Sequence, residues 1–176
     1  PLEESLGALP DNWTDRSSPG SGVFYEPAYD DLIDGDKALR MQVKDPGRGG
    51  AILEFGPIEL KKGVSIRLGL SLRSPEPSTL MVGMRSGTEE SATYYEQQVP
   101  SAPNWTSGDV SMQVTIDDPD ARFYVSMDQP GTVEIDLFFV APYGSQTGSV
   151  IPIAIEDSPN LLSTSSFPDG VHAPWV

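Results

Sequence analysis

Aromatic and arginine side chains that could hold a sugar occur on segments of alternating polarity. In the stretch DARFYVSM (120–127), Phe123 and Val125 belong to the apolar face, so Tyr124 and Arg122 point the other way. An aromatic plane stacks on the apolar face of a sugar ring, and guanidinium groups donate to its oxygens. Outward positions on other segments supply further candidates. We therefore expect a carbohydrate site among Tyr124, Arg122, Arg73, Arg85, Tyr95 and Gln97, the alternative being an ordinary solvated sheet face.

The sequence contains no recognisable catalytic constellation. His172 is the only histidine and cysteine is absent, which excludes a histidine triad and thiolate metal sites from the body of the domain. Adjacent acids such as Glu89–Glu90 and Asp117–Asp118 are common in so acidic a chain, and nothing selects two carboxyls across a cleft, as glycoside hydrolysis requires. We expect no enzymatic activity in this segment.

The net charge of the chain disfavours two classes of binding partner. Twenty-six acidic residues against 11 basic ones give a formal charge of −15, which argues against nucleic acid and anionic membrane surfaces. No run approaches the roughly 18 apolar residues of a membrane span. The acidity favours solubility, or the binding of a hard cation such as Ca²⁺.

These side chains must be positioned by β-strands. In 64–74 (VSIRLGLSLRS), apolar residues alternate strictly with polar residues or glycine, which is the pattern of a strand with one buried face. The same alternation recurs at 80–84, 110–116, 121–127 and 133–139, with inward positions that include Ile116, Leu137 and Phe139. Further strands are expected at 39–43, 51–55 and 93–99.

The predicted class is all-β. No stretch of ten or more residues has helical spacing, and 17 glycines and 17 prolines interrupt the chain at short intervals. About eight one-sided strands need a second sheet to cover them. The prediction is a two-sheet antiparallel β-sandwich of the jelly-roll type, and a barrel is the weaker alternative.

The triplet Asn-Trp-Thr occurs at 12–14 and again at 104–106. The residues that follow the two copies do not align, so a duplicated unit is not expected. Each copy instead combines a turn with a tryptophan that enters the sheet edge or core, and we predict that Trp13 and Trp105 are largely buried. Both triplets are also N-glycosylation sequons, which matters only in a eukaryotic source.

Five segments of the sequence match the pattern of a known family, namely 1–14, 34–43, 58–74, 104–114 and 120–142. In this order they resemble carbohydrate-binding modules of the family-4/9 type, which have a galactose-binding-like jelly roll. The resemblance covers roughly residues 1–142, with Leu2 and Ile66 standing where aromatic residues are usual. It implies a non-catalytic module that binds a polysaccharide beside a linked catalytic domain, in a secreted or cell-surface glycoside hydrolase or polysaccharide lyase.

The same resemblance implies a structural Ca²⁺ held by Glu3, by Asp36 with the turn around it, and by Asp136. The stretch DDLIDGD (30–36) is similar to an EF-hand loop only superficially, because no glutamate follows at the twelfth position and no helix pattern flanks it.

The domain boundary is expected near residue 145, with the sandwich over 1–145. Residues 146–176 are then a linker and the start of a following domain, because NLLSTSSF (160–167) is similar to the beginning of such a module, or else a strand-donating tail. A function of another class also stays open, namely a structural or adhesive β-sandwich of a cell-surface or filament protein without sugar specificity.

Overall fold

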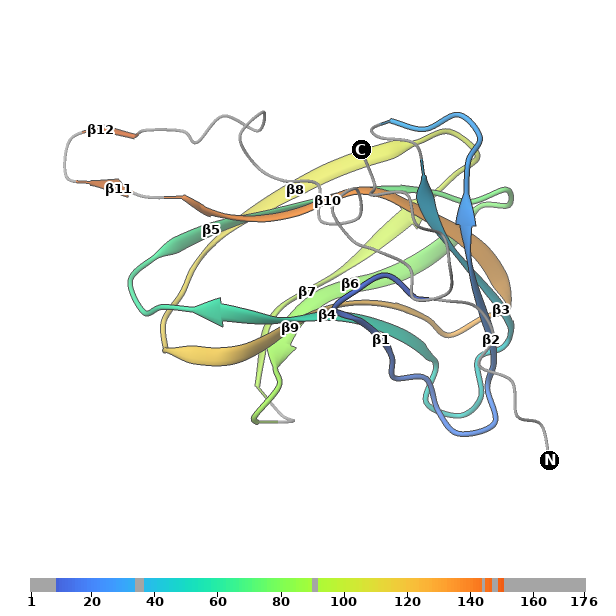
Figure 1. Ribbon diagram of the computed structural model, residues 1–176, viewed down its shortest axis with the longest axis horizontal. Helices are drawn as coiled ribbons and strands as arrows, with labels where there is room; N and C mark the ends of the chain where they lie inside the picture. Colours follow the sequence, from blue (N-terminus) through green and yellow to red (C-terminus); the bar gives the residue numbers. More distant parts are fainter. Residues whose placement is uncertain (1–8, 34–36, 90–91, 144, 147–148, 151–176) are drawn as a thin grey trace.

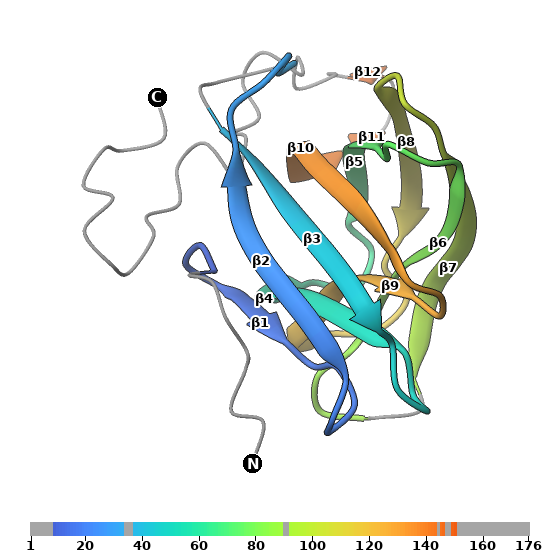
Figure 2. The ribbon, with the colours of Figure 1, turned by 90° about the vertical axis from the view of Figure 1, so that its right-hand side faces the viewer.

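The chain folds into two antiparallel five-stranded sheets packed face to face (Figures 1 and 2). The computed structural model describes residues 9–33, 37–89, 92–143, 145–146 and 149–150. Sheet I has the order β1 (Trp13–Asp15), β4 (Ala51–Leu60), β9 (Asp118–Met127), β6 (Ser78–Ser86) and β7 (Thr93–Ser101). Sheet II has the order β2 (Gly22–Ala28), β3 (Ala38–Asp45), β10 (Gly131–Tyr143), β5 (Ser65–Arg73) and β8 (Thr106–Gln113).

The predicted all-β sandwich is therefore confirmed. The described residues include no helix, and hence no helix that could cross a membrane. A short hairpin of β11 (Ser145–Gln146) and β12 (Ser149–Val150) follows β10. The strand β2 was not predicted, because Gly22 and Pro27 interrupt its alternation; as an edge strand it tolerates a proline.

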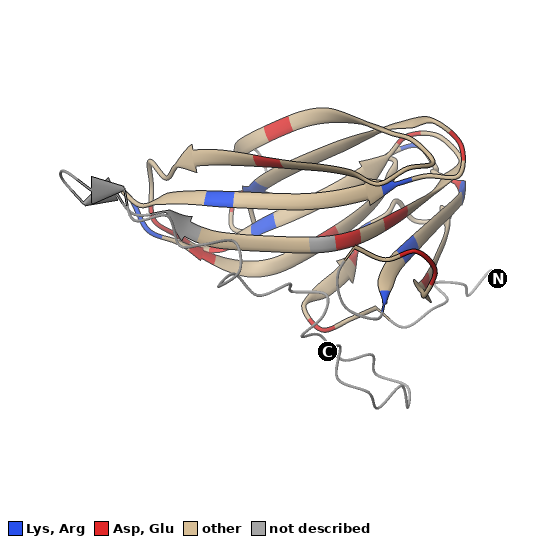
Figure 3. Cartoon of the chain, turned by 90° about the horizontal axis from the view of Figure 1, so that it is seen from above, with Lys and Arg blue, Asp and Glu red and all other residues tan. Residues whose placement is uncertain are grey.

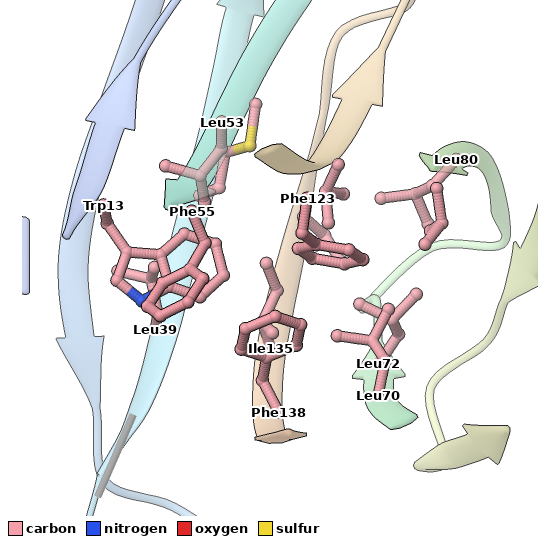
Figure 4. Packing of buried hydrophobic residues seen from close by; sticks show 14 of the residues in the cluster. Trp13, Leu39, Leu53, Phe55, Leu70, Leu72, Leu80, Phe123, Ile135 and Phe138 are labelled. Atoms are coloured by element: carbon pink, nitrogen blue, oxygen red, sulfur yellow. The ribbon is translucent and has the colours of Figure 1, made fainter. Parts of the chain in front are cut away.

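Aromatic residues from both sheets meet at the centre of the sandwich (Figure 4). The Phe123 and Phe138 ring centroids lie 4.4 Å apart, and Trp13 packs on Phe55 at 5.3 Å. Trp13 is only 5% exposed, which confirms its predicted burial. This cluster anchors β1, β4 and β9 against β10 through large apolar areas.

A register shift in β10 changes the predicted inward set. Ile135 faces the core as expected, but the pairing with β5 shifts between Asp136 and Phe138. Phe138 consequently enters the core, and Phe139 lies on the outer face over Gly69. The prediction that Phe139 faces inward was wrong because one extra residue at a bulge reverses the alternation beyond it. The side chain of Leu137 is not among those described.

The strand β8 lies earlier in the chain than its sequence pattern indicated. It spans Thr106–Gln113 and Val114 is still buried, but Ile116 is 44% exposed, against the prediction that it faces inward. Three polar residues and Gly108 at the start of β8 hid its first half from a search for apolar alternation.

Candidate functional site

Tyr124 occupies the centre of the outer face of sheet I. It is in register with Glu54 of β4 and Gly83 of β6. A Cβ atom on Gly83 would lie 2.6 Å from Cζ of Tyr124, so the absence of a side chain at this position lets the ring lie directly on the sheet. The residue pair thus fixes the tyrosine against the backbone of β6.

Charged groups enclose the Tyr124 ring. The Arg85 guanidinium lies over the ring, 5.2 Å from its centroid, and its Nε donates to Glu54 at 2.8 Å. The Tyr124 hydroxyl donates to Glu96 on β7. Burial, together with the Glu96 carboxylate, raises the pKa of Tyr124. The Tyr124 ring lies on the predicted outer face, but these neighbours cover it, and only 6% of the residue is exposed.

Arg122 completes the predicted cluster on this face. It is in register with Arg85 on the neighbouring strand β6, and its guanidinium pairs with Asp120. The structure therefore brings together Tyr124, Arg85 and Arg122, which we call the Tyr124 cluster. Each of the two arginines has a carboxylate partner.

A polar hollow of about 900 Å³ continues the face beyond Tyr124. Its floor includes Met81, Gln98 and Ser126, which form the next row across the sheet. Its walls are the loops at 74–77 and 128–130, together with the first residues of β6 and β10. Hydroxyl, amide and carboxylate groups dominate this lining, and these groups can hydrogen-bond the hydroxyls of a sugar.

A second hollow of about 280 Å³ adjoins the first. It is lined by residues 47–50 and shares Ser126, Met127 and Asp128 with the larger one. Sequence reasoning missed Ser126 as a site residue, although it stands two positions beyond Tyr124 on the same face. It also left Gln98 out, because the stretch TYYEQQV (93–99) has no clear apolar alternation to show which side chains face inward.

Arg73 does not belong to this face. Its strand, β5, lies in sheet II, where Glu26, Arg40, Glu134 and Arg73 form one row of alternating charge across β2, β3, β10 and β5. Arg40 Nε donates to Glu134 at 2.8 Å, and Arg73 Nε donates to the other oxygen of the same carboxylate. Basic and acidic positions are interspersed over the strands in this way (Figure 3).

Trp105 also lies on the outer face of sheet II, at the start of β8. The Arg73 guanidinium stands 4.6 Å from the centroid of its ring, and its indole N–H donates to the Asp31 carbonyl. The ring is partly buried at the sheet edge, as the turn-and-tryptophan pattern predicted, but it lies outside the core cluster that Trp13 joins. Its local sequence predicted a strand start but carried no information about which face the ring covers.

Tyr95 and Gln97 face the opposite side of sheet I from Tyr124. They are in register with the core residues Met84 and Val82, respectively, at the edge of the sandwich. The Tyr95 hydroxyl donates to Gln97. These two residues line a separate slot between the sheets and are not part of the Tyr124 cluster.

Of the predicted calcium ligands, only Asp136 lies within the described residues. It is fully buried on β10, and one carboxylate oxygen accepts the backbone N–H of Ile33 at 2.6 Å. This contact places a carboxylate against the loop that leads to Asp36. Glu3 and Asp36 themselves lie outside the described residues, and no group of three metal-ligating side chains occurs within them.

Comparison with known proteins connects this fold to carbohydrate-binding modules. No protein-family model and no curated protein matches the sequence. Among solved structures, a family-4 carbohydrate-binding module matches with a TM-score of 0.62 and 16% identity, covering 74% of this chain and 86% of that one. The N-terminal cellulose-binding domain of Cellulomonas fimi β-1,4-glucanase C gives 0.58 and 10%, covering 79% and 93%.

A third similar structure is the CBM22-1 xylan-binding domain of Paenibacillus barcinonensis Xyn10C, with a TM-score of 0.54 and 14% identity, covering 77% of this chain and 88% of that one. At these identities the likeness concerns the fold. The chain therefore has the fold of carbohydrate-binding modules, which confirms the resemblance at the level of architecture.

Proposed function

We propose that this chain is a non-catalytic carbohydrate-binding module, and that its binding site is the outer face of sheet I with the adjoining hollow. The observation that carries the proposal is the continuity between the Tyr124 cluster and a hollow of about 900 Å³ lined by Gln98, Ser126 and polar loop residues. A fixed aromatic–arginine cluster beside a hydroxyl- and amide-rich hollow is suited to an extended, hydroxyl-rich ligand.

The charges of this face favour an uncharged glycan. Arg85 and Arg16 both contact Glu54, and Arg122 contacts Asp120. With Glu96 at the Tyr124 hydroxyl, three carboxylates balance the three guanidinium groups of this face. The hollow itself contains Glu76 and Asp128 but no lysine or arginine. A polyanion would also meet the formal charge of −15 of the whole chain.

The fold neighbours support a polysaccharide as the ligand. One is described as a xylan-binding domain and another as a cellulose-binding domain, and both of these polymers are sugar chains. A Clostridium thermocellum Xyn10B structure of the same fold joins its CBM22-1 module to a GH10 module and is complexed with xylohexaose. By this analogy, the present module would hold a secreted or cell-surface glycoside hydrolase or polysaccharide lyase near its polymer, since tethering raises the effective concentration.

Affinity electrophoresis through gels that contain neutral or acidic polysaccharides tests the proposal. We expect retardation in at least one neutral gel, and none in an acidic gel. Gln98→Ala should weaken that retardation about fivefold to tenfold, because one hydrogen bond is worth about 1 kcal/mol. The matched control is Gln113→Ala, which removes an exposed strand glutamine from sheet II and should leave retardation unchanged.

Two outcomes would contradict the proposal. Migration of the wild-type chain without retardation in every gel would favour a structural or adhesive sandwich. Equal loss of retardation in Gln98→Ala and Gln113→Ala would place the ligand elsewhere.

A further inference from the structure

The loop that joins β3 to β4 carries one charged side chain beside the two hollows of sheet I. Its sequence is PGRGG (46–50), and Arg48 at its centre is exposed. The loop leads into Ala51, which is in register with Met127 at the end of β9. Arg48 therefore lies near the end of the strand that carries the Tyr124 cluster, and it lines the smaller hollow together with Asp128.

The glycines of this loop, and not its arginine, determine the path of the backbone. Gly47 and Gly50 have φ angles of 65° and 81°, a conformation that residues with a side chain rarely adopt. A Cβ atom on Gly49 would overlap the hydroxyl oxygen of Ser18. The three glycines thus pack closely where a side chain would not fit, and Arg48 is left as the only side chain of the loop that can reach a ligand through polar atoms.

Two opposite charges stand at the smaller hollow without pairing. Arg48 is the only cationic residue among the described residues that line either hollow, and Asp128 lines both hollows. Both residues are exposed, and neither side chain makes an ion pair or hydrogen bond with another described residue. Arg85 and Arg122 differ in this respect, because each already contacts a carboxylate.

An arginine and a carboxylate that are not paired with each other can together bind a neutral diol. A sugar hydroxyl is both a donor and an acceptor, so one hydroxyl can donate to Asp128 while its neighbour accepts from Arg48. Hydrogen bonds to ionised groups are roughly twice as strong as those between neutral groups. An anionic ligand would be repelled by the carboxylate and a cationic one by the guanidinium.

We propose that Arg48 and Asp128 form a subsite for a sugar unit with two adjacent free hydroxyls. This inference rests on the proposed function, because the subsite would bind one unit of the same glycan. Tyr124 and Asp128 are four residues apart, which is about 13 Å at strand spacing, so an extended chain can contact the larger hollow and the subsite together.

The linkage of the glycan decides whether such a unit is present. In a 1,4-linked chain, hydroxyls 2 and 3 of each unit stay free and adjacent. In a 1,3-linked glucan, no two adjacent hydroxyls of an internal unit are free. The subsite should therefore strengthen the binding of 1,4-linked chains and contribute nothing to the binding of a 1,3-linked chain.

Affinity electrophoresis of the full chain tests this selectivity. The gels contain xylan, glucomannan or galactomannan, which have 1,4-linked backbones, or the 1,3-linked glucan laminarin. Arg48→Ala and Asp128→Ala should each weaken retardation about tenfold in every 1,4-linked gel that retards the wild type, and should leave migration through laminarin unchanged. The matched control is Lys62→Ala, which removes an exposed charge beyond the opposite end of β4 and should leave migration unchanged in all gels.

The outcomes separate the subsite from the proposed function. Wild-type retardation in Arg48→Ala, with Gln98→Ala still weakened, would overturn the subsite alone. Retardation of the wild type by laminarin only, or equal losses in laminarin and in the 1,4-linked gels, would also overturn it. Unretarded migration of the wild type in every gel would overturn the subsite together with the proposed function.

A double variant tests whether the two side chains hold the same sugar unit. If they do, Arg48→Ala combined with Asp128→Ala should weaken retardation by about tenfold, as each single change does, because the unit is released when either contact is lost. Two independent contacts would give a loss of about a hundredfold, and that result would overturn the shared subsite. Thermal unfolding of all three variants should match the wild type, since neither side chain contacts the fold.

Discussion

At the scale of single residues, Gly83 determines where the Tyr124 ring lies. An alanine there would place its Cβ 2.6 Å from the ring, so the ring would have to move away from its contacts with Arg85 and Glu96. We expect Gly83→Ala to lower the free energy of unfolding by about 1–3 kcal/mol, as overpacking does, and to weaken glycan retardation.

The matched control is Gly108→Ala, which adds the same methyl group on β8 where nothing lies within 4 Å. It should change the free energy of unfolding by no more than about 0.5 kcal/mol. Urea unfolding followed by tyrosine and tryptophan fluorescence measures both variants. Equal stabilities would show that Tyr124 is not held by the close approach to β6.

Asp118 provides a pH-dependent contribution at the same scale. Burial by itself would raise its pKa, but hydrogen bonds from Tyr94, the Asp120 backbone and Ser86 together outweigh this effect and lower the pKa. Because the folded pKa lies below the unfolded one, the carboxylate stabilises the fold fully above about pH 4, and this stabilisation is lost as the pH falls through the folded pKa.

We therefore expect Asp118→Asn to cost about 1.5 kcal/mol at pH 7, with a difference from wild type that shrinks below about pH 4. Thermal unfolding of both proteins between pH 2.5 and 7 measures this difference. The exposed Asp128→Asn should show no comparable trend. A stability difference between wild type and Asp118→Asn that stays constant down to pH 2.5 would contradict the lowered pKa of Asp118.

At the scale of elements, the charge row across sheet II ties together strands that are far apart in sequence. Glu134 on β10 is 4% exposed and contacts Arg40 of β3 and Arg73 of β5. Removing this carboxylate leaves two guanidinium groups facing each other. We expect Glu134→Ala to lower the free energy of unfolding by about 2–3 kcal/mol. The loss is smaller than for breaking a fully buried ion pair, because Arg40 keeps contact with solvent.

Glu26→Ala is the control for that prediction. Its side chain is 42% exposed and contacts Arg40 from the sheet edge, so its removal should cost less than about 1 kcal/mol. Chemical denaturation at low and moderate salt separates the two variants. Equal losses of stability in Glu134→Ala and Glu26→Ala would mean that the charge row of sheet II acts as a set of independent surface ion pairs.

Period-two alternation predicted individual strands well because it is a local property. It put Arg122 and Tyr124 on one face correctly, since two residues of one strand share a face whatever lies beside them. It could not decide which strands are neighbours. Arg85 belongs to the site because β6 lies beside β9 in sheet I, whereas Arg73 lies on β5 in sheet II. Nor could it anticipate the bulge that turns Phe139 outward, because that shift arises from the pairing of β10 with β5.

The enclosure of Tyr124 also depended on more than one strand. Glu54, Arg85 and Glu96 come from β4, β6 and β7, and only the assembled sheet places them around the ring. The hollow beside it needed the loops at 74–77 and 128–130, which contain few apolar residues and hence no alternation to interpret.

At the scale of the whole molecule, the formal charge of −15 would favour the binding of a hard cation. Asp136 is a fully buried carboxylate that contacts the backbone of the loop before Asp36, and such a group is suited to a hard cation with oxygen ligands. We propose that Ca²⁺ binds there, with Glu3 and Asp36 as further ligands. A ligand bound only by the folded state at a hundredfold excess over its Kd adds about 2.7 kcal/mol.

For a domain of this size, that stabilisation corresponds to a Tm about 5–10 °C higher with millimolar Ca²⁺ than with chelator. Asp136→Asn should abolish this difference between the two melting curves, whatever its own effect on stability, because it removes a charged oxygen ligand. Asp45→Asn, which alters an exposed carboxylate at the end of β3, should preserve it. Coincident wild-type melting curves with calcium and with chelator would exclude the calcium site. The buried Asp136 carboxylate would then serve only to hold the loop through its hydrogen bond from Ile33.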